Sequence, residues 1–265
     1  MYEFNYQRPT SPDAAAKAVA ASDDGKYLAG GMTMIPTMKQ RLAQPSDLVD
    51  IGAIAELSGI RREGEELVIG ATTTHAEVAA SPDVQGAIPA LAELASHIGD
   101  PAVRARGTIG GSIANADPAA DYPAAIVGLG ATVQTNSRSI AADDFFTGLF
   151  ETALEDDELI TAVRFPVPSR AGYAKFPNPA SRYAVVGVMV SEGSAGTRVA
   201  VTGAGPSVFR VAEMEQALGG SFSSDAVGGV SVPAAGLNTD IHASDEYRAH
   251  LVTVMAKRAV DAATS

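Results

Sequence analysis

Two glycine pairs, each set among small and apolar residues, constrain this chain more than any other feature. Gly30-Gly31 follows Lys26–Ala29, which predicts a short strand, and precedes a short helix predicted over 35–42. Pro36 suits the first turn of that helix. Two residues without a Cβ permit a sharp turn, and successive N–H groups in such a turn form a concave site for an anion. The segment therefore predicts a strand, a tight turn and a helix around a group such as a diphosphate.

The second glycine segment, over 108–121, adds polar side chains to the same pattern. Gly110-Gly111 lies between the hydroxyls of Thr108 and Ser112, and the carboxylates of Asp117 and Asp121 follow. A carboxylate here is able to accept hydrogen bonds from a ribose. The alternative is that both aspartates cap turns and the helix predicted to start near 123. Two such segments in one chain favour a dinucleotide held between them.

Composition removes several classes of function. The 265 residues include no cysteine, which excludes disulfides, thiolate zinc sites, a cysteine nucleophile and an iron–sulfur cluster held by this chain. Acidic residues number 31 against 19 basic ones, a net charge of −12 that would repel a nucleic acid. The four histidines have no metal-ligand spacing, and the common nucleotide-binding and hydrolase motifs are missing. We therefore expect no metal ligand and no catalytic residue of those classes.

The N-terminal stretch has neither the basic region nor the apolar run of a secretory signal. No segment approaches the roughly 20 apolar residues that span a bilayer. We expect a cytoplasmic location without a transmembrane segment, with the inner face of the membrane as a further option.

Strands and helices are mixed without strict alternation, which predicts an α+β fold. The segment 57–69 predicts a hairpin, and Thr74–Glu77 has the form of a capping box. A helix is predicted over 84–98 with Asp83 as its N-cap, and the acidic run 155–158 predicts a solvent-exposed turn. A strand that ends at 166–168 in two prolines marks a boundary between domains 1–168 and 169–265.

Both glycine segments resemble those of one family. Ala29-Gly30-Gly31-x-Thr33-x-x-Pro36 resembles an A-G-G-x-S-x-x-P loop, and 108–121 resembles a T-I-G-G then A-D-P-A-A-D loop, of the FAD-binding medium subunits of molybdenum hydroxylases. That family includes the aerobic carbon monoxide dehydrogenase medium chain and the flavin domain of xanthine dehydrogenase. Tyr173-x-Lys175-Phe176, the segment 182–186 and the closing helix are also similar, so the resemblance covers nearly the whole chain.

The resemblance implies a two-subdomain FAD-binding domain of the vanillyl-alcohol-oxidase or PCMH type over 1–168, split near 55–60. A smaller α+β domain with a three-stranded sheet and helices follows over 169–265. It also implies a noncovalent FAD.

The resemblance further implies where the FAD contacts lie. The first segment would surround the diphosphate with Ala29, Gly30, Gly31, Met32, Thr33 and Met34, and the second would bind its other side with Thr108, Gly110, Gly111 and Ser112, followed by Asp117. Asp121 would hold the adenosine ribose. Ile160 and Lys175 would lie near the isoalloxazine or the ribityl chain, and Tyr173 would cover the ring. From the residues alone, Lys175 has the alternative of extending to water from its strand.

In such a family the medium subunit passes electrons from [2Fe-2S] clusters of a small partner subunit through FAD to a quinone or NAD. A large subunit with the molybdopterin cofactor oxidises the substrate, and two heterotrimers form a dimer. Carbon monoxide is the favoured substrate, with an N-heterocycle, an aldehyde or a purine as alternatives. Two other classes stay open: a stand-alone FAD oxidoreductase of the same fold, and a non-catalytic nucleotide-binding module.

Overall fold

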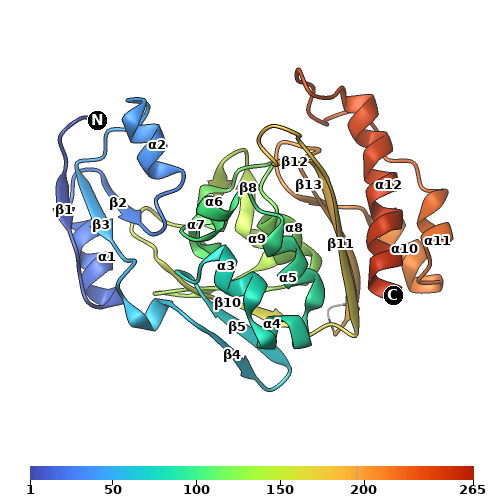
Figure 1. The fold of residues 1–265 in the computed structure, drawn as a ribbon, viewed down its shortest axis with the longest axis horizontal. Helices are drawn as coiled ribbons and strands as arrows, with labels where there is room; N and C mark the ends of the chain where they lie inside the picture. Colours follow the sequence, from blue (N-terminus) through green and yellow to red (C-terminus); the bar gives the residue numbers. More distant parts are fainter. Residues whose placement is uncertain (195) are drawn as a thin grey trace.

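The structure, a computed structural model, describes residues 1–194 and 196–265. Figure 1 shows three lobes arranged along the longest axis, with the N-terminus in the first and the C-terminus in the last. We name them the N-terminal lobe (β1–β3, α1, α2), the central lobe (β4–β10, α3–α9) and the C-terminal lobe (β11–β14, α10–α12). Within the described residues, no helix is both long and apolar enough to cross a membrane.

The N-terminal lobe is a small parallel sheet with two helices. Its strands pair in the order β1-β3-β2, with β1 at Asn5–Gln7, β3 at Asp47–Asp50 and β2 at Gly25–Leu28. Helix α1 (Pro12–Ala20) starts at Ser11, whose side chain accepts a hydrogen bond from the N–H of Ala14 at 3.3 Å. Helix α2 (Met34–Lys39) follows the first glycine pair. The predicted strand, turn and short helix are therefore all present.

The central lobe contains an antiparallel five-stranded sheet in the order β4-β5-β10-β6-β7. The strands are β4 (Ile60–Glu63), β5 (Glu66–Gly70), β10 (Ile160–Pro166), β6 (Thr132–Thr135) and β7 (Ser139–Ala141), and β8 (Phe146–Gly148) with β9 (Glu151–Thr152) forms a separate hairpin. The helical segments are η1 (Ala55–Leu57), α3 (His75–Ala80), α4 (Pro82–Ala87), α5 (Pro89–Ser96), α6 (Pro101–Arg104), α7 (Ile109–Asn115), α8 (Tyr122–Gly128) and α9 (Ala142–Phe145). Strand β10 pairs with both β5 and β6, so the chain returns to the middle of its own sheet.

Local signals in this lobe give mixed results. The hairpin at 57–69 and the capping box of Thr74 and Glu77 are both confirmed. The helix predicted over 84–98 is instead two helices, α4 and α5, which separate at Ile88. A residue before proline is kept out of the helical region, and Ile88, which precedes Pro89, has φ −142 and ψ 73. Ser81, not Asp83, caps the first of them.

The acidic run at 155–158 is a turn with residues 155–157 exposed, as predicted, but its last residue, Glu158, is only 7% exposed. It accepts hydrogen bonds from Arg138 at 2.8 Å and from Thr135 Oγ1 at 2.6 Å, and the Arg138 guanidinium is the main cause that lowers the pKa of Glu158 to about 2. A carboxylate this deeply paired ties the turn to β6 rather than to solvent.

The C-terminal lobe is an antiparallel sheet covered by helices. Its strands are β11 (Arg170–Pro177), β12 (Ala184–Gly193), β13 (Gly196–Thr202) and β14 (Phe209–Arg210), in that order, and its helices are α10 (Ala212–Gly220), α11 (Ser224–Gly228) and α12 (Asp245–Thr264). The sheet has four strands rather than the three expected, because the two-residue β14 pairs with β13. Helix α12 packs across β11 and β12 (Figure 1).

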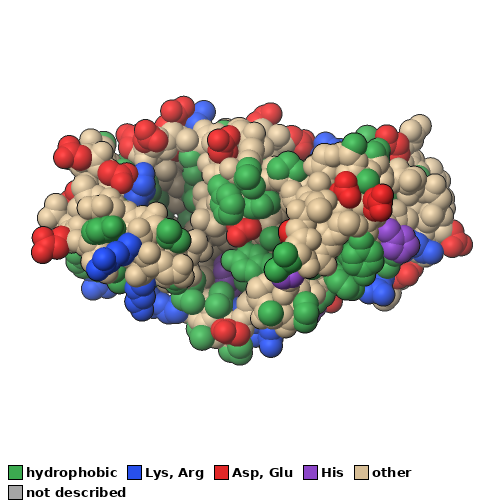
Figure 2. All heavy atoms as spheres, turned by 90° about the horizontal axis from the view of Figure 1, so that it is seen from above, with side chains coloured by type: hydrophobic (Ala, Val, Ile, Leu, Met, Phe, Trp, Pro, Cys, Tyr) green, Lys and Arg blue, Asp and Glu red, His purple; other side chains and the backbone are tan. Residues whose placement is uncertain are grey.

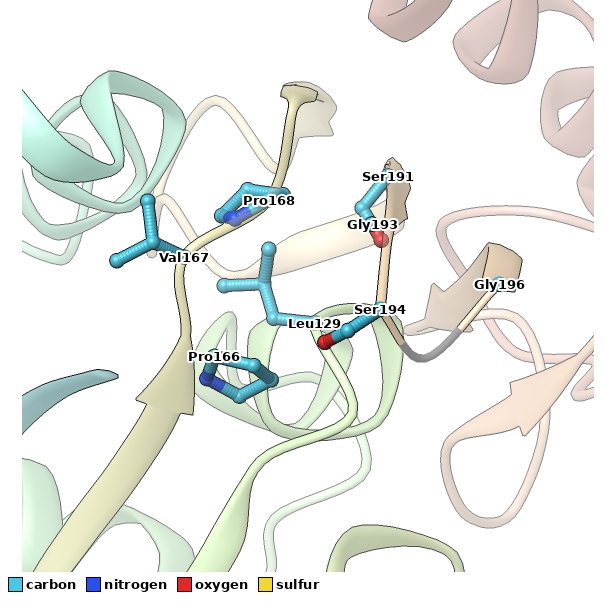
Figure 3. Close-up of a pocket in the computed structure, with 8 residues that line it drawn as sticks. All are labelled: Leu129, Pro166, Val167, Pro168, Ser191, Gly193, Ser194 and Gly196. Atoms are coloured by element: carbon cyan, nitrogen blue, oxygen red, sulfur yellow. The ribbon is translucent and has the colours of Figure 1, made fainter. Parts of the chain in front are cut away.

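The central and C-terminal lobes are joined by polar contacts to the end of one helix. The last carbonyls of α8 are buried, and Arg198 Nε donates to Val127 O at 2.7 Å while Ser191 Oγ donates to Gly128 O at 2.6 Å. Figure 3 shows the neighbouring linker, where Leu129 lies beside Pro166 and Pro168 and the residues that end β12. The pocket that they line is about 10 Å³, far too small for a dinucleotide.

We expect Gly172→Ala to destabilise the fold by about 1–3 kcal/mol, as overpacking of a core does. A Cβ at Gly172 in β11 would overlap Ala259 O and lie 2.8 Å from Ala263 N in α12, so the helix must move off the sheet. Urea unfolding measures the change. As the control, Gly219→Ala in α10 meets no atom within 4 Å and is expected to raise stability by up to about 1 kcal/mol. Equal unfolding free energies for the two variants would contradict the prediction.

Candidate functional site

The two glycine segments meet at the boundary between the N-terminal and central lobes. A Cβ on Gly30 would overlap Arg106 O and lie 3.0 Å from Gly107 Cα, and a Cβ on Gly111 would lie 3.9 Å from that of Ala29. Figure 2 views the molecule from above and shows a hollow in the surface between these two lobes. Segments distant in the sequence therefore lie side by side, the placement that a dinucleotide held between them requires.

The first segment offers unused hydrogen-bond donors. The N–H groups of Gly30, Gly31, Met32 and Thr33 donate to no acceptor within the described residues. Gly31 has φ +71, a left-handed conformation that favours glycine, and α2 begins three residues later at Met34. Met32 and Thr33 are exposed. Adjacent free N–H groups on a left-handed turn are the arrangement that binds phosphate oxygens.

The second segment is a helix start rather than an open loop. Thr108 is the N-cap of α7, and Gly110 and Gly111 lie in its first turn. All four N–H groups from 109 to 112 donate within the protein: Ile109 to Thr73 O (3.1 Å), Gly110 to Ala71 O (2.8 Å), Gly111 to Thr108 Oγ1 (3.1 Å) and Ser112 to Thr108 O (3.0 Å). The second segment therefore presents no free amide at 109–112, although the resemblance places it on the other side of the diphosphate. Ser112 is partly exposed, whereas Thr108 is only 5% exposed and its Oγ1 already accepts the N–H of Gly111.

Asp121, Tyr173 and Lys175 form one buried polar cluster. Tyr173 Oη donates to Asp121 Oδ1 at 2.5 Å, and Lys175 Nζ lies 2.9 Å from Oδ1 and 3.0 Å from Oδ2. The side chains of Asp121 and Lys175 are each 4% exposed. Burial raises the pKa of Asp121, and the Lys175 charge opposes this shift. Burial also raises the pKa of Tyr173 well above its ordinary value, so the phenol keeps its proton and donates a hydrogen bond to the carboxylate.

One ion pair joins two residues that the resemblance assigns to different parts of the FAD: Asp121 to the adenosine ribose and Lys175 to the isoalloxazine or the ribityl chain. Both assignments stay predictions. The alternative of a Lys175 that extends to water is wrong, because its ammonium is buried and donates a second hydrogen bond to His97 O at 3.0 Å.

Asp117 and Ile160, the other predicted contacts, have ordinary local roles. Asp117 Oδ1 accepts the N–H of Ala119 at 2.9 Å, so the turn-capping alternative is confirmed for this residue. Asp121 is the N-cap of α8 but makes no side-chain capping bond. Ile160 is buried in the central core where β10 begins.

Sequence reasoning missed the support beneath the first segment. The main element of this support is His75, which starts α3 and is only 4% exposed. A Cβ on Gly107 would lie 2.6 Å from His75 Nε2, so the backbone at 106–107 runs between the His75 ring and Gly30. Within the described chain, His75 Nδ1 and the Tyr122 hydroxyl have no partner, with the two rings 5.4 Å apart. The capping box of Thr74 and Glu77 predicts that His75 lies in the first turn of a helix, but no local sequence pattern indicates that its side chain is buried.

The family described as "FAD binding domain in molybdopterin dehydrogenase" matches residues 2–168. The chain therefore belongs to this family of FAD-binding proteins. The resemblance and the α+β fold class inferred from the sequence are both confirmed.

Among curated relatives, the chain is 36% identical to the carbon monoxide dehydrogenase medium chain of Hydrogenophaga pseudoflava, over 98% of this chain and 96% of the relative. It is 35% identical to the nicotine 6-hydroxylase medium subunit of Paenarthrobacter nicotinovorans, over 97% and 96%. A solved carbon monoxide dehydrogenase from Hydrogenophaga pseudoflava matches with a TM-score of 0.89 at 36% identity, over 99% of this chain and 98% of the other. Quinoline 2-oxidoreductase from Pseudomonas putida gives the same TM-score at 29% identity and the same coverage.

The first segment fits the diphosphate of the FAD that the family implies. The absence of a Cβ at Gly30 lets this segment approach the backbone of Arg106 and Gly107, and the four free N–H groups begin at this glycine. Within the residues described, no group of three or more His, Cys, Asp or Glu side chains could hold a metal ion.

We expect His75 to weaken the fold as the pH falls. Burial lowers its pKa in the folded protein from 6.5 to about 4, so the unfolded chain binds a proton that the folded chain rejects. The destabilisation is absent above pH 6.5, grows as the pH falls and reaches about 3 kcal/mol at pH 4, levelling off below that pH. The unfolding free energy is measured from pH 7 to pH 4 for the wild type and for His75→Phe. The wild type should lose stability over this range by the amount that His75 contributes, and His75→Phe should lose correspondingly less. The exposed control His250→Gln should keep the wild-type slope; a slope unchanged in His75→Phe would contradict the assignment.

Proposed function

We propose that this chain is the FAD-binding medium subunit of a molybdenum hydroxylase of the carbon monoxide dehydrogenase type. When bound, FAD would supply the electron-transfer chemistry that links [2Fe-2S] clusters of a small partner subunit to a quinone or NAD, and this chain would hold it. A large subunit with the molybdopterin cofactor oxidises the substrate. Medium subunits that serve an N-heterocycle, aldehyde or xanthine hydroxylase are the alternative, since the nicotine 6-hydroxylase medium subunit is nearly as similar to this chain as the carbon monoxide dehydrogenase medium chain.

The observation that carries the proposal is the meeting of the two glycine segments beside four free N–H groups. In this proposal the amides of Gly30–Thr33 bind the FAD diphosphate, flanked by Ala29 and Met34. Thr108 and Ser112 contribute hydroxyls from the start of α7, where Gly110 and Gly111 allow the close approach. The chain itself binds and orients the cofactor, and excludes water with its two lobes.

The buried cluster of Asp121, Tyr173 and Lys175 is proposed to border the cofactor, with Asp121 at the adenosine ribose and with Tyr173 and Lys175 near the isoalloxazine or the ribityl chain. Asp117, which begins the turn that leads to this cluster, and Ile160, where β10 begins, are further proposed contacts. We also keep the proposed division into a FAD-binding domain over 1–168, with subdomains split near 55–60, and a C-terminal domain over 169–265. The matched range of 2–168 supports that boundary.

The absence of cysteine supports the proposed partners. A chain that relays electrons from iron–sulfur clusters without a thiol must receive them from another subunit. We propose a heterotrimer that forms a dimer. Copurification with a molybdenum subunit and a cysteine-rich subunit is the expected result; a monomer that oxidises an organic substrate with oxygen would instead support the stand-alone oxidoreductase.

FAD binding is tested directly on the purified full-length chain. We expect flavin absorbance bands after incubation with FAD and removal of excess. Acid precipitation should release all of the yellow colour, because the chain has no cysteine to form a cysteinyl bond. A chain that stays colourless with FAD would overturn the proposed function in favour of a non-catalytic module, and colour left in the precipitate would show a covalent link.

Gly30→Ala should weaken FAD binding by at least about 10-fold, equivalent to about 1.4 kcal/mol. Its methyl group would lie 2.7 Å from the Arg106 carbonyl carbon and would force the two lobes apart. Fluorescence titration with FAD gives the dissociation constant, and circular dichroism checks that the variant is folded. Gly86→Ala in α4, where a Cβ meets nothing within 4 Å, is the matched control. A folded Gly30→Ala variant with wild-type affinity would show that this contact does not shape the site.

A further inference from the structure

The turn at 117–121, which joins α7 to α8, is held almost entirely by the C-terminal lobe. Its three middle carbonyls accept hydrogen bonds from β12 and from the end of β13, and its last side chain belongs to the buried cluster with β11. The donors are Gly203 N to Pro118 O (2.7 Å), Thr202 Oγ1 to Pro118 O (3.0 Å), Thr202 Oγ1 to Ala120 O (2.6 Å) and Ala184 N to Ala119 O (3.1 Å). The C-terminal sheet thus sets the shape of a turn that belongs to the matched FAD-binding region.

Thr202 is the one side chain among these donors, and it is fully buried. Its hydroxyl lies between two carbonyls of the turn and has a single proton for both. Without this hydroxyl, Pro118 O keeps the N–H of Gly203, but Ala120 O loses the only donor recorded for it in the described chain. An unpartnered buried carbonyl is costly, so the turn would shift to find another donor.

The turn is connected rigidly to the glycine segments. Helix α7 has only seven residues between Thr108 and Ala116, and a helix of that length spans about 10 Å. Its first turn is tied to 71–73 by the N–H groups of Ile109 and Gly110. A displacement of the turn therefore moves Asp121 and the buried cluster that the proposed function places beside the cofactor.

We propose that Thr202 is a positioning residue for the cofactor: it fixes the turn at 117–121 against the C-terminal sheet and so sets the affinity for FAD without touching it. This inference rests on the proposed FAD function. In this proposal the C-terminal lobe holds the turn at 117–121 in place, while the diphosphate contacts come from the other two lobes.

The test compares FAD dissociation constants of the full-length wild type, Thr202→Val and Thr202→Ser, measured by fluorescence titration. Valine keeps the shape and removes the hydroxyl, so we expect FAD binding about 10-fold weaker or more, while serine restores the donor and binds within about 2-fold of the wild type. The matched control is Thr253→Val, since Thr253 Oγ1 makes the same kind of bond to Val230 O at 3.0 Å, away from the turn. It should lower the thermal midpoint as Thr202→Val does but leave FAD affinity unchanged.

The inference is overturned if Thr202→Val binds FAD like the wild type, if Thr202→Ser is as weak as Thr202→Val, or if Thr253→Val loses as much affinity. A wild type that binds no FAD would instead refute the proposed function, and the inference would fall with it. Both variants are compared only after circular dichroism shows that they are folded, and a Thr202→Val chain that does not fold is replaced by Thr202→Ala under the same criteria.

Discussion

The close contact between Gly30 and the backbone at Arg106 and Gly107 is the constraint on which the site depends. No side chain beyond hydrogen fits at Gly30, because a Cβ would overlap a backbone oxygen that has no freedom to move. His75 supports that backbone from the opposite side and is itself buried, so the contact has a firm base. Two lobes with separate sheets therefore meet at a defined distance, and the free N–H groups of the first segment lie along their boundary.

The charge of the chain and the choice of donors are consistent with each other. A protein with a net charge of −12 must bind an anionic diphosphate without relying on its overall field. Lys175, the buried cation that contacts the turn at 117–121, is already paired with Asp121, and this pairing cancels most of its charge. Neutral backbone N–H groups are then the natural donors, since they attract phosphate oxygens without a competing acidic partner.

Elements that follow short-range rules were predictable, and those that depend on distant partners were not. The capping box of Thr74 and Glu77, the hairpin at 57–69 and the long C-terminal helix each rest on neighbours in the chain. The sequence predicts that Glu158 is part of an exposed acidic turn, because its ion pair with Arg138 forms only in the folded chain. The fourth strand of the C-terminal sheet is two residues long, too short for a pattern, and exists only because β13 lies next to it.

By itself the sequence determined the two glycine segments, the missing thiols and the mixed α+β fold, because residue type alone decides where a Cβ is absent and which ligands a chain lacks. It also supplied the residues that the proposed function places around the cofactor. The tertiary structure decided which of them are available. Thr108 starts a helix and its neighbours use their N–H groups internally, Asp121 and Lys175 neutralise each other in the interior, and Thr202 reaches the turn at 117–121 from another lobe. Hydrogen-bond donors satisfied by distant partners leave no local trace in the sequence, so only the folded chain shows which donors remain free.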